Sequence, residues 1–368
     1  MNHHKQAEIF GVGNPIYDIC VNIHGGYLRK LRSFIPAAQW EQSYHVGDTL
    51  FEQILESLPT VPQKVVPGGG AFNTIRVLAQ LGHPTAYTGG LGTISNQRQV
   101  HASLQQGSNS DTDVHSRSVD GFSREMQLHG IRDCTMRFAG RPSGRSLSLT
   151  QEHREILIFN PAAATLLHKA EQCTVSTEKA GPQLIYIEGF ILPREDLVRT
   201  LVTYGKMHST YLAVDLGAAP IVAAKKEFLL KEVLPYTTYL FGTEEEYAAI
   251  GLAPVELLAY LRPGGAETGF GQHACLIVKR GASGSRLLYG THTFDISAEP
   301  TRAVNSLGAG DAYAAFFISE LLRGTTPETA ARLASYGCSL FLNSFGGFLD
   351  TRTVAAIRKQ FFHSLRLG

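Results

Sequence analysis

The chain has 368 residues, of which 43% are hydrophobic and 18% charged, as in a folded globular protein with a sizeable core. Its 33 basic and 32 acidic residues leave a net charge of +1, which excludes a broadly basic surface for nucleic acid or an anionic membrane. The five cysteines are far apart and form no Cys-x-x-Cys pair, so neither a disulfide framework nor a zinc site is expected.

The N-terminal part of the chain alternates short strands and helices, with glycines at the turns. Met1–Phe10 lacks an apolar segment and no run of about 18 apolar residues follows, so we expect a cytoplasmic protein without a membrane span. Strands are expected at 9–13, 14–23, 64–66 and 86–92, and helices at 47–60 and 71–81.

The middle of the chain changes in composition. Residues 95–120 are dominated by Ser, Gln, Asn, Asp, Gly and His, which predicts a mobile surface insertion. Further on, 146–150 and 155–159 are typical of a hairpin around the polar residues 151–154.

After residue 180 the chain becomes regular. Short, continuously apolar strands are expected at 184–187, 211–214, 239–241 and 274–278, mostly separated by helical stretches. Such alternation predicts a parallel sheet covered by helices on both faces. Ligands of such sheets bind beyond the carboxyl ends of the strands, where the polar and Gly-rich segments of this chain lie.

The segment Asn305–Asp311, with the sequence NSLGAGD, precedes an apolar run that predicts a helix. Free amides and the positive end of the helix dipole would converge there, as in a site for phosphate or a developing anion. Asp311 beside such a site would accept a proton from an incoming hydroxyl, which indicates phosphoryl transfer to an alcohol. An ordinary helix start with an acidic first turn is the alternative for this motif alone.

Three segments in order resemble the signatures of the ribokinase-like, or PfkB-type, carbohydrate and nucleoside kinases. They are Gly13-Asn14-Pro15-x-x-Asp18, the PGGGAFN sequence of Pro67–Asn73, and NSLGAGD. The resemblance spans roughly residues 8–350 apart from 95–120. It implies an α/β three-layer sandwich with a central, mostly parallel sheet flanked by helices. A small β-sheet lid, from about 14–45 and 130–165, would complete a single domain over 1–368.

The resemblance also implies the residues that bind the acceptor. Asp18 would accept hydrogen bonds from vicinal hydroxyls, and the glycines would let a sugar approach the backbone. A turn carboxylate and a plain strand–helix turn are the alternatives. The implied acceptor-binding residues are Asn14, Asp18, Gly69, Gly70, Asn73 and Phe190. Phe190, Tyr17 or Phe72 could line a slot for a base, with core packing as the alternative.

The phosphoryl donor implied by the resemblance is ATP with Mg²⁺, and a monovalent cation is a further possibility. Asp311 would be the general base and the amides of Gly308, Ala309 and Gly310 the anion hole. Glu246, the last residue of an N-x-x-E-like motif, would act on Mg²⁺ through water, although a solvated helix start is the alternative. The implied ATP-binding residues are Lys279, Gly281, Gly284 and Asn305. Asp215 is a weaker candidate for the phosphate and metal network.

The sequence departs from the family pattern at three places. Position 305 is Asn where Asp is usual, position 243 is Thr where N-x-x-E has Asn, and Gly92-Thr93-Ile94 lacks the usual Gly-x-Asp. These differences leave room for a catalytically weakened relative.

The acceptor is left open between two classes. Several segments, including the Asn-Pro opening and Gly189-Phe190, resemble adenosine-kinase-like members more than sugar kinases, which favours a nucleoside. A ketose, ribose or sugar acid is the alternative, and a sugar acid would need a cation such as Arg145 or Arg137. A non-catalytic nucleoside or sugar binder is a third reading, and either a monomer or a homodimer is compatible with the sequence.

Overall fold

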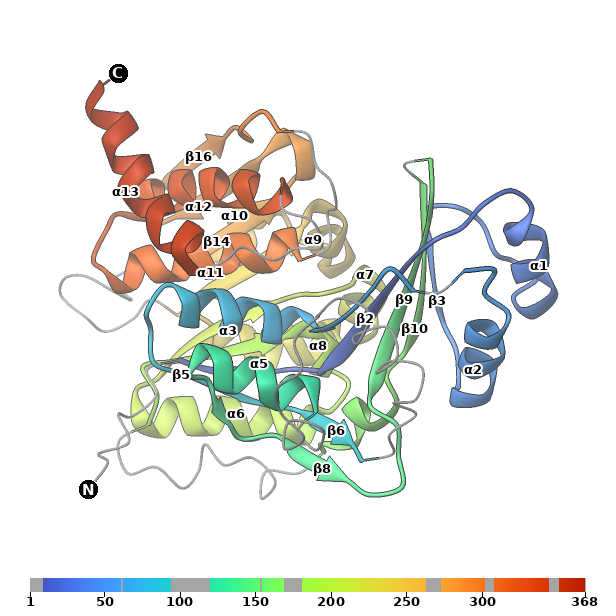
Figure 1. Ribbon diagram of the computed structural model, residues 1–368. Coiled ribbons are helices and arrows are strands. Elements are labelled where there is room, and N and C mark those ends of the chain that lie inside the picture. Colours follow the sequence, from blue (N-terminus) through green and yellow to red (C-terminus); the bar gives the residue numbers. More distant parts are fainter. Residues whose placement is uncertain are drawn as a thin grey trace.

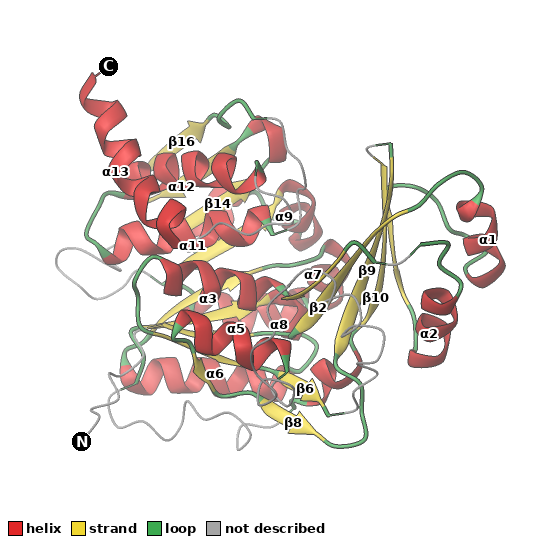
Figure 2. Ribbon diagram, in the orientation of Figure 1, coloured by secondary structure: helices red, strands yellow, loops and turns green. Residues whose placement is uncertain are grey.

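The fold is built on one large sheet whose strands run through the centre of the molecule (Figures 1 and 2). The computed structural model describes residues 9–60, 62–93, 120–152, 154–168, 181–262, 273–301, 308–343 and 351–367. The nine strands are β1 (Ile9–Val12), β5 (Thr85–Thr88), β7 (Arg132–Asp133), β11 (Leu184–Glu188), β12 (Tyr211–Asp215), β13 (Tyr239–Thr243), β14 (Cys275–Lys279), β15 (Ser285–Tyr289) and β16 (His292–Ile296). Their order is β16-β15-β14-β13-β12-β11-β1-β5-β7.

All pairs in this sheet are parallel except those that join β14, β15 and β16. Alternate residues of each strand point into two separate apolar cores, for example Leu184 and Tyr186 into one and Ile185 and Ile187 into the other. Burial of both faces explains why these strands are continuously apolar in sequence, and the expected parallel sheet is confirmed.

Helices cover both faces of the large sheet (Figure 2). One face carries α3 (Gly70–Gln80), α5 (Gly121–His129), α11 (Ala309–Leu322), α12 (Pro327–Leu342) and α13 (Thr351–Leu367). The other carries α6 (Glu195–His208), α7 (Ala219–Ala224), α8 (Lys226–Phe228), α9 (Glu244–Ile250) and α10 (Pro254–Leu258).

Helix α11 is deeply packed against its neighbours. Every residue from Ala312 to Ile318 is buried, so the helix contacts apolar neighbours all around. At Gly337 of α12 a Cβ would lie 2.7 Å from the ring of Phe316, which shows how closely the two helices approach. The N-terminus of α11 is therefore held rigidly at the carboxyl ends of the central strands.

A second sheet projects from the large one (Figure 1). Its strands are β2 (Ile16–Asn22), β3 (Gln42–His45), β4 (Lys64–Gly68), β9 (Gly144–Gln151) and β10 (Arg154–Asn160), in the order β3-β10-β9-β2-β4. The hairpin expected around 151–154 is confirmed as β9 and β10. Helices α1 (Tyr27–Phe34) and α2 (Asp48–Glu56) cover one face of this small sheet, and its other face is turned toward the rest of the molecule.

The small sheet differs in detail from the lid segments expected at 14–45 and 130–165. Strand β4 lies outside both segments, while β7 and β8 (Met136–Phe138), inside the second, pair with β5 and with β6 (Gly90–Gly92). The insertion expected at 95–120 falls outside the described residues except Asp120, which caps α5. No disulfide joins the four cysteines of the described ranges to one another, and no helix within those ranges is long and apolar enough to cross a membrane.

Candidate active site

Asp311 lies in the first turn of α11, where a base for an acceptor hydroxyl was expected. Gly308 is the N-cap of this helix with φ +77, a left-handed conformation that glycine adopts without strain. The first intrahelical bond runs from the amide of Ala312 to the carbonyl of Gly308, so the amides before residue 312 have no intrahelical acceptor. Burial raises the pKa of Asp311 to about 6, and the bond from Asn73 opposes that shift. A carboxyl with this pKa is mostly ionised at neutral pH and can accept a proton.

Asn73, in the first turn of α3, contacts Asp311 directly. Its Nδ2 donates to Oδ2 of Asp311 at 3.0 Å, while its Oδ1 accepts from Nη2 of the buried Arg76 at 3.1 Å. Arg76 thereby fixes which way the amide of Asn73 points. Thr74 adds a bond from its hydroxyl to the backbone carbonyl of Asp311 at 3.2 Å. Asn73, expected to bind a hydroxyl, thus also orients the carboxylate.

Asp18 occupies a buried position on β2 of the small sheet. Its Oδ1 accepts from the hydroxyl of Ser146 on β9 at 2.6 Å. Burial raises the pKa of Asp18 to about 6, against the lowering effects of Ser146 and Arg76. Asp18 also contributes to the raised pKa of Asp311, so the two carboxylates face a common region.

The glycines before α3 allow the backbone to pass close to the β1–β2 turn. Gly69 has φ +97, and a Cβ there would lie 2.1 Å from the carbonyl oxygen of Asn14. A Cβ at Gly70 would lie 3.3 Å from Oδ1 of Asp311. The structure therefore brings Asn14, Gly69, Gly70 and Asp311 together, as the sequence predicted.

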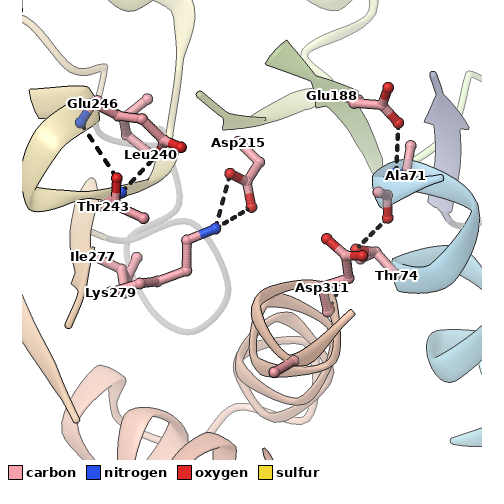
Figure 3. A network of polar contacts seen from close by, with 12 residues as sticks. Ala71, Thr74, Glu188, Asp215, Leu240, Thr243, Glu246, Ile277, Lys279 and Asp311 are labelled. Carbon is pink, nitrogen blue, oxygen red and sulfur yellow. Dashed lines mark hydrogen bonds and ion pairs between the residues drawn. The ribbon is translucent and has the colours of Figure 1, made fainter. Parts of the chain in front are cut away.

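Lys279, at the end of β14, lies opposite Asp311 in Figure 3 and forms an ion pair with Asp215 at the end of β12. Its Nζ is 2.9 and 2.7 Å from the two carboxylate oxygens. A Cβ on Gly310 would lie 3.2 Å from this ammonium group, which places the cation beside the N-terminus of α11. Burial alone would lower the pKa of Lys279, but Asp215 and Glu246 raise it, so the group is charged at neutral pH. An anion at the start of α11 would meet both the helix amides and this cation.

Glu246 is buried in the first turn of α9, where it forms a capping box with Thr243 (Figure 3). The amide of Thr243 donates to its Oε2 at 2.9 Å, and the hydroxyl of Thr243 accepts the amide of Glu246 at 3.3 Å. Thr and Asn are both good N-cap residues, so the departure from N-x-x-E at position 243 preserves this local structure. Burial raises the pKa of Glu246. Among its charged neighbours, Lys279 lowers this pKa and Asp215 raises it, so Glu246, Lys279 and Asp215 share one electrostatic environment.

The contacts of the remaining expected binding residues, three for ATP and one for the acceptor, do not bear on their predicted roles. Gly281 and Gly284 flank a short 3₁₀ turn between β14 and β15, so the hairpin reading of this loop is confirmed and their role toward ATP stays a prediction. Asn305 lies outside the described residues. Phe190 is half-buried beside Gly217, which follows β12, and its contact with a base also stays a prediction.

Two further aromatic residues considered for a base slot lie elsewhere. Phe72 is fully buried in the core and packs edge-on against Tyr87 and Phe122. Tyr17 precedes Asp18 on β2 and therefore points to the opposite face, where it also packs against Phe122. Core packing, the alternative given above, is correct for both residues.

The register of the small sheet instead places a different ring on the face that carries Asp18. Asp18 is paired with Ser146 on β9, Ser146 with Phe159 on β10, and Phe159 with His45 on β3. Paired residues share a face, so these four side chains form one row, which we call the Asp18 row. Phe159 is half-buried, and its ring stacks on that of His45 with centroids 5.5 Å apart. Sequence periodicity predicted the hairpin but not which of its faces is covered, so this ring was missed.

Glu188 was also missed, although its position at the carboxyl end of β11 could have indicated it. Both of its carboxylate oxygens accept backbone amides, those of Asn14 at 3.2 Å and Ala71 at 2.9 Å. The pKa of Glu188 is raised to about 7, mainly by burial. The charge of Asp311 adds to this rise, and the two hydrogen bonds from the amides oppose it. Glu188 thus lies within electrostatic reach of Asp311 (Figure 3).

Comparisons with known proteins agree with this geometry. Residues 120–351 match the model of the pfkB family carbohydrate kinases, more than half of the chain. The chain is 25% identical to a 5-dehydro-2-deoxygluconokinase of Shouchella clausii over 67% of its length and 77% of that protein. It is 23% identical to the adenosine kinase of Saccharomyces cerevisiae over 92% of its length and 96% of that protein. The crystal structure of adenosine kinase from Sinorhizobium meliloti superposes with a TM-score of 0.75 at 18% identity, covering 97% and 99% of the two chains, and so has the same fold.

Proposed function

Because the chain belongs to the PfkB family of carbohydrate kinases and is an ATP-dependent phosphotransferase, we propose that it phosphorylates the primary hydroxyl of a nucleoside resembling adenosine. Both an adenosine kinase and a sugar-type kinase are among its relatives, so the acceptor has to be argued from the site itself. The observation that carries the proposal is the Asp18 row, which places a buried carboxylate and an aromatic ring on one face.

In the proposed reaction Asp311 accepts the proton of the acceptor hydroxyl as that oxygen attacks the γ-phosphate of ATP in line. The amides at Gly308, Ala309 and Gly310 and the ammonium group of Lys279 would stabilise the charge on the transferred group. One contact and one electrostatic property support this role for Asp311: Asn73 fixes its carboxylate, and its raised pKa matches that of a general base.

The dimensions of the Asp18 row support a nucleoside acceptor. Neighbouring strands are about 4.8 Å apart, so Phe159, two strands from Asp18, lies at roughly 10 Å along the row. The side chain of Ser146 between them is short and buried. A ribose whose hydroxyls bind Asp18 would then direct its base over the ring of Phe159, where stacking is favourable.

A sugar acid is disfavoured as the acceptor, because the two arginines considered as its cationic contacts are already paired with carboxylates of the protein. Arg145 lies on the face covered by α2, where it stacks on Phe51 and pairs with Glu52 at 2.6 Å. Arg137 pairs with Asp120 and Asp133. Neutral sugars remain the second candidate, because Asp18 and the Gly-rich turn at 69–70 would serve any vicinal diol.

Mg²⁺ is expected to accompany ATP, and the residues present are compatible with it. Glu246 uses one oxygen in its capping box, which leaves the other available to a metal-bound water. No cluster of three or more His, Cys, Asp or Glu side chains that could hold a metal ion occurs within the described ranges. When bound, the ion would neutralise charge on the phosphates.

The test is a steady-state assay of ATP consumption with a panel of nucleosides, ribose and ketoses. We expect nucleosides to have the highest kcat/KM. Phe159→Ala should raise the KM for the nucleoside roughly 5- to 150-fold, the range given by about 1–3 kcal/mol for stacking of one base, and leave that of ribose unchanged. Leu157→Ala is the matched control, because Leu157 is half-buried on the same face but one row farther from Asp18. Turnover of sugars alone, or equal effects of the two variants, would contradict the nucleoside proposal.

A further inference from the structure

The chain passes between the large and the small sheet at several places, and three of these connections meet near one point. The first is the turn 13–15 between β1 and β2, and the second is Gly69 between β4 and α3. The third follows β10, where Pro161 leads into a short 3₁₀ helix, η2 (Ala162–Leu166). The orientation of the small sheet relative to Asp311 depends on how these connections are held.

Glu188 holds the first two connections together. It extends from the large sheet, is 4% exposed, and accepts the amides of Asn14 and Ala71 with its two oxygens. The fit is tight, since a Cβ at Gly13 would lie 2.4 Å from Oε2 of Glu188. Both amides belong to segments that continue into or out of the small sheet.

Arg194 joins the first connection to the third. Its guanidinium is on the large-sheet side, immediately before α6, and the residue is 8% exposed. One end donates to Oδ1 of Asn14 at 2.6 Å, and the other to the carbonyls of Ala164 at 2.7 Å and Leu167 at 3.3 Å. The planar guanidinium holds acceptors on two segments at once through donors in a fixed geometry, whereas a lysine would offer only one small, flexible ammonium group.

The contact with Asn14 also fixes the direction of that side chain. Because Oδ1 of Asn14 accepts from Arg194, the amide nitrogen is turned away from the guanidinium. Glu188 receives the backbone amide of the same residue, so Asn14 is held at two points by groups of the large-sheet layer. Its position is therefore set from outside the small sheet.

We propose that Arg194, supported by Glu188, is a positioning residue that sets the orientation of the small sheet and presents Asn14 and Asp18 to the acceptor. This inference rests on the proposed function for the assignment of Asn14 and Asp18 to acceptor binding. Displacing a bound reactant by about 1 Å can cost 10²-fold in rate, so a contact remote from the reacting atoms can matter for catalysis.

The experiment compares Arg194→Met and Arg194→Lys with Arg199→Met. Arg199 lies on α6, just after Arg194, and makes exposed ion pairs with Glu195 and Glu232, so its removal controls for the loss of a positive charge near the start of this helix. Kinetics are measured with whichever acceptor the wild type phosphorylates best. Arg194→Met should raise the KM for the acceptor tenfold or more and leave the KM for ATP within twofold, because the nucleotide loop belongs to the large sheet. Arg194→Lys should recover only part of the loss, and Arg199→Met should resemble the wild type.

A double variant separates positioning from general stability. If Arg194 acts through Asn14, Arg194→Met should add little to the acceptor KM in an Asn14→Ala background, although both single changes raise it. Equal changes in both KM values, or full additivity in the double variant, would overturn the proposal. Turnover of a sugar in place of a nucleoside would contradict the nucleoside proposal and leave this test intact.

Hydrogen exchange tests the same inference without turnover. The amides of Asn14 and of residues 162–167 should exchange faster in Arg194→Met than in Arg199→Met, while those of α11 are unchanged. Equal exchange in the two variants would overturn the proposal even if no acceptor were found.

Discussion

Replacing Asp311 by Asn should have opposite effects on activity and on stability. The change keeps the size of the side chain and a partner for Asn73, but removes the proton acceptor. Loss of a general base typically lowers the rate about 10²–10⁴-fold. At neutral pH the same change removes a carboxylate whose ionisation is made unfavourable by burial, so the folded protein should become more stable.

The size of this gain follows from the pKa. Burial raises the pKa of Asp311 from 3.8 to about 6. At about 1.4 kcal/mol per pH unit, this difference corresponds to roughly 3 kcal/mol. Because Asp311 is only partly buried, we expect about 1–2 kcal/mol after allowing for solvent. The folded pKa exceeds the unfolded one, so the gain is full above pH 6 and disappears as the pH falls toward 3.8.

The assay is denaturant unfolding of the wild type and of Asp311→Asn at several values between pH 4 and 8, paired with turnover at pH 7.5. The difference in unfolding free energy should grow with pH and then level off above pH 6. Undiminished turnover would refute the assignment of the base. A variant less stable than the wild type at neutral pH would refute the argument from burial.

Three further predictions concern the same region. The kcat/KM for the acceptor should fall as the pH drops through about 6, more steeply than for one proton, because Asp311 and Asp18 must both be ionised; a flat profile between pH 5 and 8 would contradict this. Lys279→Met should lower the free energy of unfolding by about 3 kcal/mol, because it leaves the charge of Asp215 without its cationic partner. Adding Asp215→Asn should restore the stability measured by urea titration but should not restore turnover. Thr243→Ala should lower the free energy of unfolding by about 1 kcal/mol through loss of the capping box, whereas Thr243→Asn should keep both stability and activity. Equal losses of stability in the two variants would argue against the cap.

Much of the fold could be predicted because local patterns determine it. Continuous apolar strands after residue 184 can only be buried on both faces, and the Gly-rich segment before α3 needs the positive φ of Gly69. The grouping of Asp18, Asn73 and Asp311 in one site was instead implied by the resemblance to the kinase family.

What escaped prediction depends on contacts between distant parts of the chain. Alternation along β10 shows that two faces differ, but only the packing of α2 decides that Ile158 is covered and Phe159 is not. The bonds from Arg194 to Asn14 and from Asn14 to Glu188 join residues 180 and 174 positions apart. Local periodicity carries no information about such pairs.

The deep packing of α11 bears on which part of the molecule can move during the reaction. Asp311 lies in the first turn of a helix in which the next seven residues are all buried, so the proposed base cannot move toward an acceptor without disturbing the core. Asp18 belongs to the projecting sheet, which is joined to the core through a few connections. In the proposed reaction the acceptor would therefore be carried to a stationary base, and the rate of catalysis is expected to follow the approach and withdrawal of the sheet that holds it.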